Sequence, residues 1–231
     1  MKILFKFATR SRPQKFFSCL ENIINTVESD NYQILVSADE DDETMAWDKI
    51  KDRYDLILNS VDGDVNRVIT HHGKSKNKIE AINRDFEYIR TWDILINTSD
   101  DMNFVRKGFD NIIRKDMTEQ FPDLDGFLHY NDGNQRDRVA TMSIMGRKYY
   151  ERFNYIYHPS YESLFCDEEA TEVAKRLGRH RYMGDIPLFK HLHPAWGLGE
   201  YDEQYQRTES RKVWIADENN FIERKARNFD L

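Results

Sequence analysis

The feature that most constrains the fold is residues 92–102, an apolar run that ends in two adjacent carboxylates. Ile94, Leu95 and Ile96 show no polar alternation, which is the pattern of a strand covered on both faces within a parallel sheet. Asp100 and Asp101 follow at what would be the carboxyl end of that strand. Ligands of open α/β sheets bind beyond this edge, so we expect a metal or phosphate site there.

Strand and helix patterns alternate along the first half of the chain. Ser11 and Pro13 are residues that begin helices, the first as a cap and the second at the first helical position. Alternation of this kind predicts parallel strands joined by right-handed crossovers. Strands are predicted at residues 3–7, 32–36, 56–58 and 92–97, and helices at 13–27, 45–51 and 79–89.

The second half of the chain is less regular. Gly178 is typical of the end of a helix. The whole chain is expected to form one α/β domain, with a mixed, mostly parallel central sheet flanked by helices. Helices are predicted at residues 106–117, 167–177 and from about 207, and strands at 126–130, 139–145 and 186–192.

Composition excludes several classes of protein. The 231 residues can bury a substantial core, and the formal net charge of −7 argues against a broad basic face for nucleic acid or anionic membrane. The two cysteines are too few for a disulfide framework, which favours a reducing compartment. Without a signal-peptide pattern or an apolar run of membrane-spanning length, we expect a cytoplasmic protein with no membrane span.

Oxygen and nitrogen ligands for a metal occur at two places. Asp100 and Asp101 could hold a hard cation such as Mg²⁺ or Mn²⁺, and the alternative is a solvated turn that caps the next helix. His191 and His193 lie two apart in a predicted strand, so both could face one pocket. Either histidine could complete a metal site with Asp101, and the alternative is a pair of ordinary polar residues.

A general base and a phosphate site also have candidates. Asp167, Glu168 and Glu169 begin a predicted helix, where acids favour the helix dipole. That structural role still leaves room for one carboxylate that takes a proton from an acceptor hydroxyl. Residues 73–78 form a basic loop before a helix, which suits a diphosphate but lacks the spacing of a P-loop.

In this order, the motifs resemble those of GT-A type nucleotide-sugar-dependent glycosyltransferases, particularly family 2-like bacterial and viral enzymes. The resemblance implies a Rossmann-like GT-A fold. It further implies a nucleotide-sugar-binding half at about 1–104, then an acceptor-binding half with a helical tail at about 105–231. The matching motifs are Phe-Ala-Thr-Arg at 7–10, Ser-Ala-Asp at 37–39, Lys-Ile-Glu-Ala-Ile-Asn at 78–83, Ser-Asp-Asp at 99–101, Asp-Glu at 167–168 and His-Leu-His-Pro at 191–194.

On the donor side, the resemblance implies roles for five residues. Thr9 and Arg10 would lie against the nucleotide, and Asp39 would read the base. Lys78 and Asn83 would line the nucleotide or diphosphate pocket.

On the reacting side, Asp100 would approach the ribose or the donor sugar. Asp101 would bind the metal with His193 as a second ligand. Ser99 takes the first position of the family's Asp-any-Asp motif, so in that motif only Asp101 carries over as a direct ligand. Asp167 would be the catalytic base, with Glu168 as its nearest rival.

The expected reaction is transfer of a sugar from a nucleoside-diphosphate sugar, with a UDP-sugar favoured, to an acceptor hydroxyl. It would invert the anomeric centre and use Mn²⁺ or Mg²⁺. The alternatives are a nucleotidyltransferase of related fold and a non-catalytic nucleotide- or sugar-binding protein. A glycan, a protein, a small molecule or a modified nucleobase all remain open as acceptors. The negative net charge of the chain disfavours nucleic acid as a partner. The local counterargument is a group of five basic residues in the tail: Arg211, Lys212, Arg224, Lys225 and Arg227.

Overall fold

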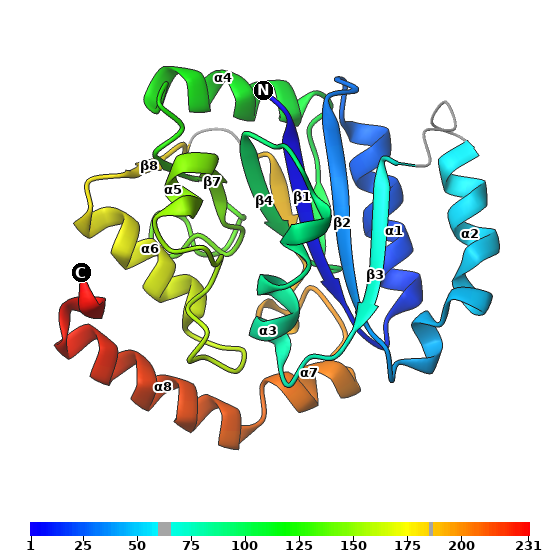
Figure 1. The fold of residues 1–231 in the computed structure, drawn as a ribbon. Coiled ribbons are helices and arrows are strands. Elements are labelled where there is room, and N and C mark those ends of the chain that lie inside the picture. Colours follow the sequence, from blue (N-terminus) through cyan, green and yellow to red (C-terminus); the bar gives the residue numbers. More distant parts are fainter. Residues whose placement is uncertain (60–65, 185–186) are drawn as a thin grey trace.

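A seven-stranded mixed sheet forms the centre of the protein, in a computed structural model that describes residues 1–59, 66–184 and 187–231 (Figure 1). The strand order is β3-β2-β1-β4-β7-β6-β8, and β5 and β9 form a separate antiparallel pair. The strands are β1 (Ile3–Thr9), β2 (Tyr32–Asp39), β3 (Val68–Gly73), β4 (Ile94–Thr98), β5 (Met102–Phe104), β6 (Phe127–His129), β7 (Ile144–Gly146), β8 (His180–Tyr182) and β9 (Phe189–His191).

The sheet is parallel through β3, β2, β1 and β4, and β7 then pairs antiparallel with both β4 and β6. β8 runs parallel to β6. The predicted mixed, mostly parallel sheet is confirmed. The β4–β7 pairing joins the two halves of the chain in one sheet. The parallel pairing of β1 with β2 and with β4 places the carboxyl ends of these three strands at one edge.

Helices cover both faces of the sheet (Figure 1). None of the helices in the described ranges has the length and apolar character needed to cross a bilayer. The helices are α1 (Pro13–Thr26), α2 (Trp47–Asn59), α3 (Lys78–Asn83), α4 (Phe109–Gln120), α5 (Arg147–Glu151), α6 (Cys166–Arg176), α7 (Glu203–Thr208) and α8 (Arg211–Ala226), with 3₁₀ turns η1 (Glu43–Met45), η2 (Phe86–Tyr88), η3 (Pro194–Trp196) and η4 (Asn228–Asp230).

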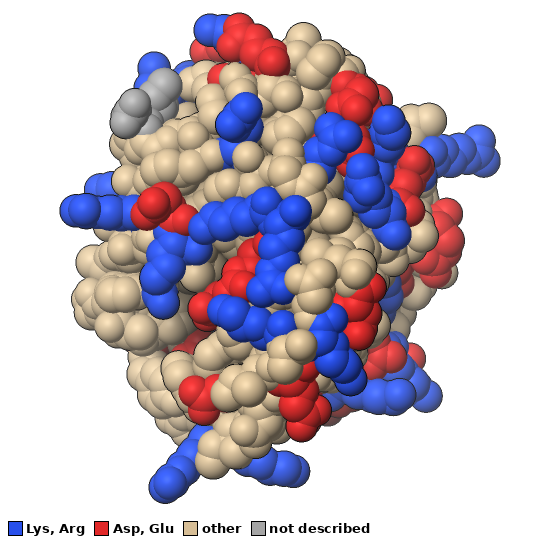
Figure 2. All heavy atoms as spheres, turned by 90° about the vertical axis from the view of Figure 1, so that its left-hand side faces the viewer, with Lys and Arg blue, Asp and Glu red and all other residues tan. Residues whose placement is uncertain are grey.

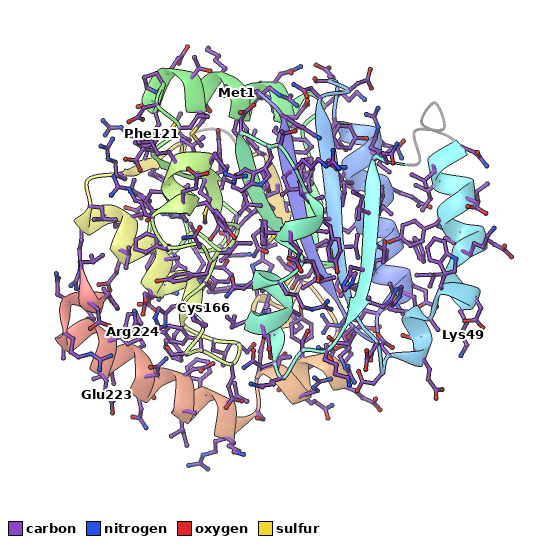
Figure 3. All side chains as sticks on the ribbon, in the orientation of Figure 1. Met1, Lys49, Phe121, Cys166, Glu223 and Arg224 are labelled. Atoms are coloured by element: carbon purple, nitrogen blue, oxygen red, sulfur yellow. The ribbon has the colours of Figure 1, made fainter. Side chains whose placement is uncertain are left out.

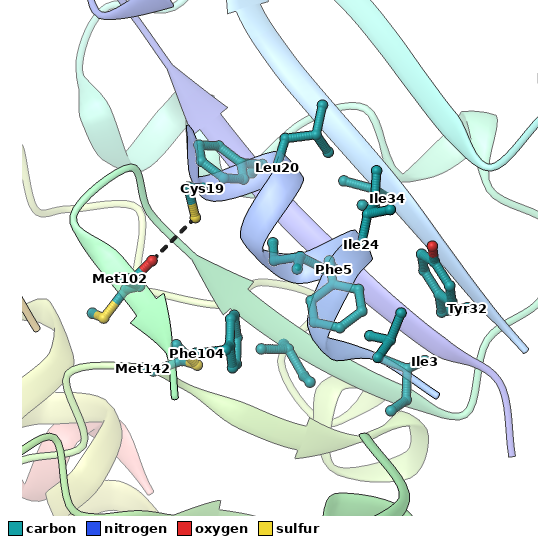
Figure 4. Packing of buried hydrophobic residues seen from close by; sticks show 14 of the residues in the cluster. Ile3, Phe5, Cys19, Leu20, Ile24, Tyr32, Ile34, Met102, Phe104 and Met142 are labelled. Carbon is teal, nitrogen blue, oxygen red and sulfur yellow. Dashed lines mark hydrogen bonds between the residues drawn. The ribbon is translucent and has the colours of Figure 1, made fainter. Parts of the chain in front are cut away.

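Alternation along the strands sends apolar side chains to two cores. Phe5 of β1 faces α1, where it packs with Leu20 and Ile24, as Figure 4 shows. Leu4 faces the opposite side and joins the core under α3 and α6. The Cys19 thiol donates to the Met102 carbonyl oxygen over 3.2 Å, which ties α1 to β5 beside the carboxyl end of β4.

Two elements in the first half differ from the sequence prediction. Residues 56–58, predicted as a strand, belong to α2, because Ile50, Tyr54 and Ile57 recur at helical spacing and are buried together. The third strand is instead β3. The single helix predicted at 79–89 ends at Asn83, since Asp85 adopts a left-handed φ of 75° and the chain continues as η2.

Further differences lie at element ends. Ser11 is not the cap of α1: its φ is 59°, and Arg12 occupies the cap position without a side-chain bond while Pro13 begins the helix. The strand predicted at 139–145 is shortened to β7. The strand predicted at 186–192 is observed as β9, and its first residue, Ile186, lies outside the described residues.

Lys6 is a fully buried lysine on β1. Its Nζ donates to the Ser37 hydroxyl, which in turn donates to the Asp85 carboxylate. Burial lowers the pKa of Lys6 to about 7, and the negative charge of Asp85 opposes this only in part. The folded chain therefore releases this proton at a far lower pH than the unfolded chain does.

We predict that wild-type protein gains stability relative to the Lys6→Met variant as pH rises from about 7 to 10.5. In this window the unfolded wild-type chain holds the lysine proton that the folded chain has lost, so the free energy of unfolding rises with pH. The difference between the two proteins should change by on the order of 3–5 kcal/mol across the window. Urea unfolding below, within and above it measures this change, and a constant difference would contradict the prediction.

Candidate functional site

Two adjoining cavities of about 180 and 190 Å³ lie at the carboxyl ends of β1, β2 and β4. The first extends over the end of β2, and the second over the end of β4. Because six residues line both, the two cavities adjoin, and together they are called the cleft; residues of α7 lie along one side. The residues that line both cavities are Ala8, Arg10, Lys78, Ser163, Gln204 and Thr208.

The first cavity brings together Thr9, Arg10 and Asp39, the residues predicted to contact the nucleotide. Arg10 Nη1 donates to Asp39 Oδ2 over 2.8 Å and also binds Asp41 at the surface. Within the described structure, Thr9 Oγ1 and Asp39 Oδ1 are buried without a hydrogen bond. Asp39 Oδ1 lies 3.7 Å from Arg84 Nη2, an ion pair too long for a hydrogen bond, so both atoms keep the capacity to bond a polar ligand.

The two predicted residues of α3 have different positions. Lys78 is the first residue of the helix and lines both cavities. Asn83 lies outside the lining of either cavity. Its Nδ2 donates to the Tyr157 carbonyl oxygen over 2.6 Å, and its Oδ1 accepts from the backbone N–H of Ile156 over 2.9 Å. Its amide thus braces the chain before α6, in contrast to the pocket role predicted for it.

The second cavity contains Ser99, Asp100 and Asp101, which follow β4 as predicted. Arg12 Nη1 donates to Asp100 Oδ1 over 3.0 Å. Burial raises the pKa of Asp100 to about 6, with Arg12 lowering it and Asp101 raising it further. Asp100 therefore titrates near neutral pH while its neighbour stays ionised.

Asp101 accepts hydrogen bonds from three side chains. They are Ser99, Tyr205 of α7 over 2.6 Å and His191 over 3.2 Å. Burial opposes ionisation of Asp101, but the bonds from His191, Ser99 and Tyr205 outweigh it and hold its pKa well below the usual value. Asp101 is therefore ionised at neutral pH, and it lines the second cavity.

His191 is the imidazole that contacts Asp101, because β5 and β9 pair with Met102 opposite His191. His193 instead bonds Glu209 through Nε2 over 2.8 Å and accepts from the backbone N–H of Ala195. Both histidines line the second cavity, as predicted. The sequence left either one open as the partner of Asp101, and the ligand role implied for His193 stays a prediction.

A second carboxylate flanks His191. Its Nδ1 lies 3.8 Å from Asp132 Oδ2, and Asp132 is almost fully buried. Burial lowers the pKa of His191, but Asp101 and Asp132 together raise it to about 9. Asp132 was not predicted as a site residue, since its Asn-Asp-Gly-Asn context indicated only a turn.

A divalent cation in this cleft would have few protein ligands. The described residues contain no group of three or more His, Cys, Asp or Glu side chains arranged as a metal site. Asp101 Oδ2 and His191 Nε2 lie 3.2 Å apart and share a hydrogen bond, so a cation held by both would displace the Nε2 proton of His191. Mg²⁺-type ions commonly take one or two protein ligands and fill the rest with water and phosphate oxygens.

Asp167 lies in the first turn of α6 and lines the second cavity, whereas Glu168 does not. Figure 3 labels the preceding residue, Cys166, on the side of α6 toward α3. Burial raises the pKa of Asp167, and the positive charge of Lys78 opposes this. A carboxylate with a raised pKa is a better proton acceptor than an exposed one, which suits a general base.

Helix α7 supplies site residues that sequence patterns do not reveal. The Arg12 guanidinium lies 4.1 Å from the centre of the Tyr205 ring, and Asp202 before α7 accepts from Lys15 over 2.7 Å and from Arg12. Arg12 lies two residues after Arg10 in the sequence, and this proximity could have identified it as a site residue. Tyr205 lines the second cavity only because of tertiary packing, and Asp202 lies outside the lining of both cavities.

Figure 2 shows the side of the molecule that carries α6 and the end of α8, where basic side chains gather among acids. Arg176 lies 3.2 Å from Glu172, which Lys225 also contacts. Arg179 lies 3.4 Å from the buried carboxylate of Asp125. Acidic side chains lie beside these basic ones on the same face (Figure 2).

Comparison with known proteins gives matches at the level of structure. No protein-family model and no curated protein matches the sequence. The mannosyltransferase PcManGT from Pyrobaculum calidifontis, solved with GDP-Man and Mn²⁺, matches with a TM-score of 0.64 and 11% identity over 84% of this chain. Residues 1–349 of S. aureus TarS, solved with UDP-GlcNAc, match with a TM-score of 0.60 and 12% identity over 82% of this chain.

The chain has a GT-A fold. The GT-A fold class implied by the motifs is thereby confirmed. The chain spans 59% of PcManGT and 58% of the TarS segment, which is just under three fifths of either solved chain. In this GT-A fold the cleft lies at the carboxyl ends of the parallel strands, where nucleotides bind in open α/β sheets.

Proposed function

We propose that this GT-A chain is a glycosyltransferase that moves a sugar from a nucleoside-diphosphate sugar to an acceptor hydroxyl, with a UDP-sugar favoured. One observation carries the proposal: the two adjoining cavities bring together polar atoms of Thr9 and Asp39 that are buried without a hydrogen bond, the Asp101 carboxylate and the Asp167 carboxylate. PcManGT and TarS, which were solved with GDP-Man and UDP-GlcNAc, share the fold and support the donor class.

The donor would lie along the cleft. Its base and ribose would occupy the first cavity, where Asp39 Oδ1 accepts from the base and Thr9 contacts the nucleotide. Arg10 fixes Asp39 by an ion pair and so orients it before the nucleotide arrives. Lys78 lines both cavities and is placed to neutralise the diphosphate, while Asp100 approaches the ribose or the sugar.

Asp101 and His191 are the residues that would hold Mn²⁺ or Mg²⁺, and His193 remains the alternative imidazole. When bound, such a cation would supply positive charge at the departing diphosphate, where negative charge grows in the transition state. Arg12 and Lys78 add fixed positive charge along the same cleft. Ser99 and Tyr205 orient the Asp101 carboxylate through their hydroxyl groups.

Asp167 would remove the proton from the acceptor hydroxyl as its oxygen attacks the anomeric carbon. The bond from that carbon to the diphosphate oxygen breaks as the new glycosidic bond forms, and the nucleoside diphosphate leaves with the bonding electrons. Attack on the face opposite the leaving group inverts the anomeric centre. The acceptor would bind on the side of the cleft formed by the second half of the chain.

Release of nucleoside diphosphate tests the function. The protein is incubated with UDP-sugars or GDP-mannose and Mn²⁺, and free UDP or GDP is measured with and without mixed small-molecule and glycan acceptors. A nucleotidyltransferase would instead release diphosphate from a nucleoside triphosphate and sugar phosphate. A protein that binds UDP or GDP but turns over neither substrate set would be a nucleotide-binding protein and not an enzyme.

A further inference from the structure

We propose that the Ser163 hydroxyl binds the diphosphate of the donor and that Asp217 of α8 holds Ser163 in position. This inference rests on the proposed function and adds two residues to it. Ser163 is the binding residue. Asp217 is a positioning residue that acts through the loop carrying Ser163.

Ser163 lies at the junction of the two cavities. It is 5% exposed and lines both of them. Its Oγ forms no hydrogen bond to any described residue. A buried hydroxyl without a partner costs free energy, so its presence beside an open cleft indicates a polar ligand.

The loop before α6 is anchored from behind by a single carboxylate. Asp217 is 1% exposed and accepts three backbone N–H bonds, from Glu162 and Ser163 over 2.9 Å each and from Leu164 over 2.7 Å. Three amide donors on one buried carboxylate satisfy its charge and fix the backbone. The Ser163 side chain therefore has a defined position that depends on Asp217.

Helix α8 is itself fixed to α6. Arg224 lies between α8 and α6 in Figure 3, and it binds the Glu169 carboxylate with two nitrogens, over 2.8 and 2.9 Å. Both side chains are buried. This paired contact holds α8, and with it Asp217, at a set distance from the helix that carries Asp167.

The junction corresponds to the diphosphate of an extended donor. The nucleoside end would lie toward Asp39 in the first cavity, and the sugar end toward Asp101 and Asp167 in the second. What lies between a base with its ribose and a transferred sugar is the pair of phosphates. Lys78 and Arg10 also line this junction, so cationic groups and a neutral O–H donor converge on the same anion.

Calorimetric titration of UDP and of uridine in the presence of Mn²⁺ tests the inference, with GDP and guanosine as a second probe pair. The Ser163→Ala variant should bind the diphosphate about 10- to 100-fold more weakly, the range for loss of a hydrogen bond to a charged group. Its affinity for the nucleoside should be unchanged. Ser163→Thr keeps the hydroxyl and should retain most of the diphosphate affinity.

Asp217→Asn should produce the same selective loss, and the double variant with Ser163→Ala should lose little more than either single one. Glu218→Gln, an exposed neighbour on α8, removes the same charge and is the matched control that should bind normally. If Asp217→Asn fails to fold, the Ser163 variants decide alone.

The outcomes separate the inference from the proposed function. Wild-type protein that binds neither UDP nor GDP overturns both. Wild-type protein that binds a diphosphate while Ser163→Ala binds it equally well overturns only the role of Ser163. An equal loss for diphosphate and nucleoside would mean that Ser163 acts on the shape of the first cavity, which also overturns the inference.

Discussion

Asp167→Asn is expected to lower kcat by about 10²- to 10⁴-fold, the usual contribution of a general base. Asparagine has nearly the same shape but accepts no proton, so the Kd for the donor should stay close to that of wild type. Turnover is measured as release of nucleoside diphosphate in the presence of acceptor, and donor affinity by calorimetry. Glu168→Gln is the matched control, because Glu168 lies outside the lining of both cavities.

The pH profile gives an independent readout of the same residue. A base must be ionised to act, and burial raises the pKa of Asp167. Activity should therefore fall as pH decreases through this raised pKa, at a higher pH than an exposed aspartate would cause. If Glu168→Gln and not Asp167→Asn abolishes turnover, the assignment passes to Glu168.

Asp101→Ala and His191→Ala are expected to lower Mn²⁺-dependent turnover by about 10³-fold or more, since the charge stabilisation supplied by a bound cation amounts to several kcal/mol. His193→Ala should have a much smaller effect, because its Nε2 bonds Glu209. The measurement is turnover and UDP affinity as a function of Mn²⁺ concentration. Each variant is compared with wild type treated with a chelator.

Comparing the two histidine variants decides between alternatives that the sequence left open. Loss confined to His191→Ala would assign the imidazole ligand to the residue that contacts Asp101. Loss confined to His193→Ala would restore the role implied by the family resemblance. Wild-type turnover that is equal with Mn²⁺ and with chelator would contradict a metal role for Asp101 altogether.

Much of the fold could be predicted because its signals are local. The apolar run through Ile94, Leu95 and Ile96 specifies a buried strand, and Gly178 with its φ of 65° stops α6 where expected. Errors arose where local patterns were ambiguous. Residues 56–58 are apolar enough for a strand, and only the wider spacing from Ile50 to Ile57 identifies a helix.

For the candidate site, sequence patterns indicated the residues near strand ends but not those that tertiary packing adds. Asp39 at the end of β2 and Asp101 after β4 lie near each other because the carboxyl ends of parallel strands meet at one edge of the sheet. Asn83 was assigned to the pocket by resemblance. Helix α3 ends at that residue, and its side-chain amide bonds the backbone of Ile156 and Tyr157. Tyr205, Asp132 and Ser163 required the tertiary structure, because no spacing in the sequence links them to β4.

Helix α7 has a consequence for how the cleft is reached. Of its residues only Tyr205 is buried, and its attachment uses polar contacts: Tyr205 to Asp101, and Asp202 to Arg12 and Lys15. Charge pairs near the surface weaken as salt screens them, whereas apolar packing does not. We therefore expect α7 to be held less firmly along the cleft as ionic strength rises.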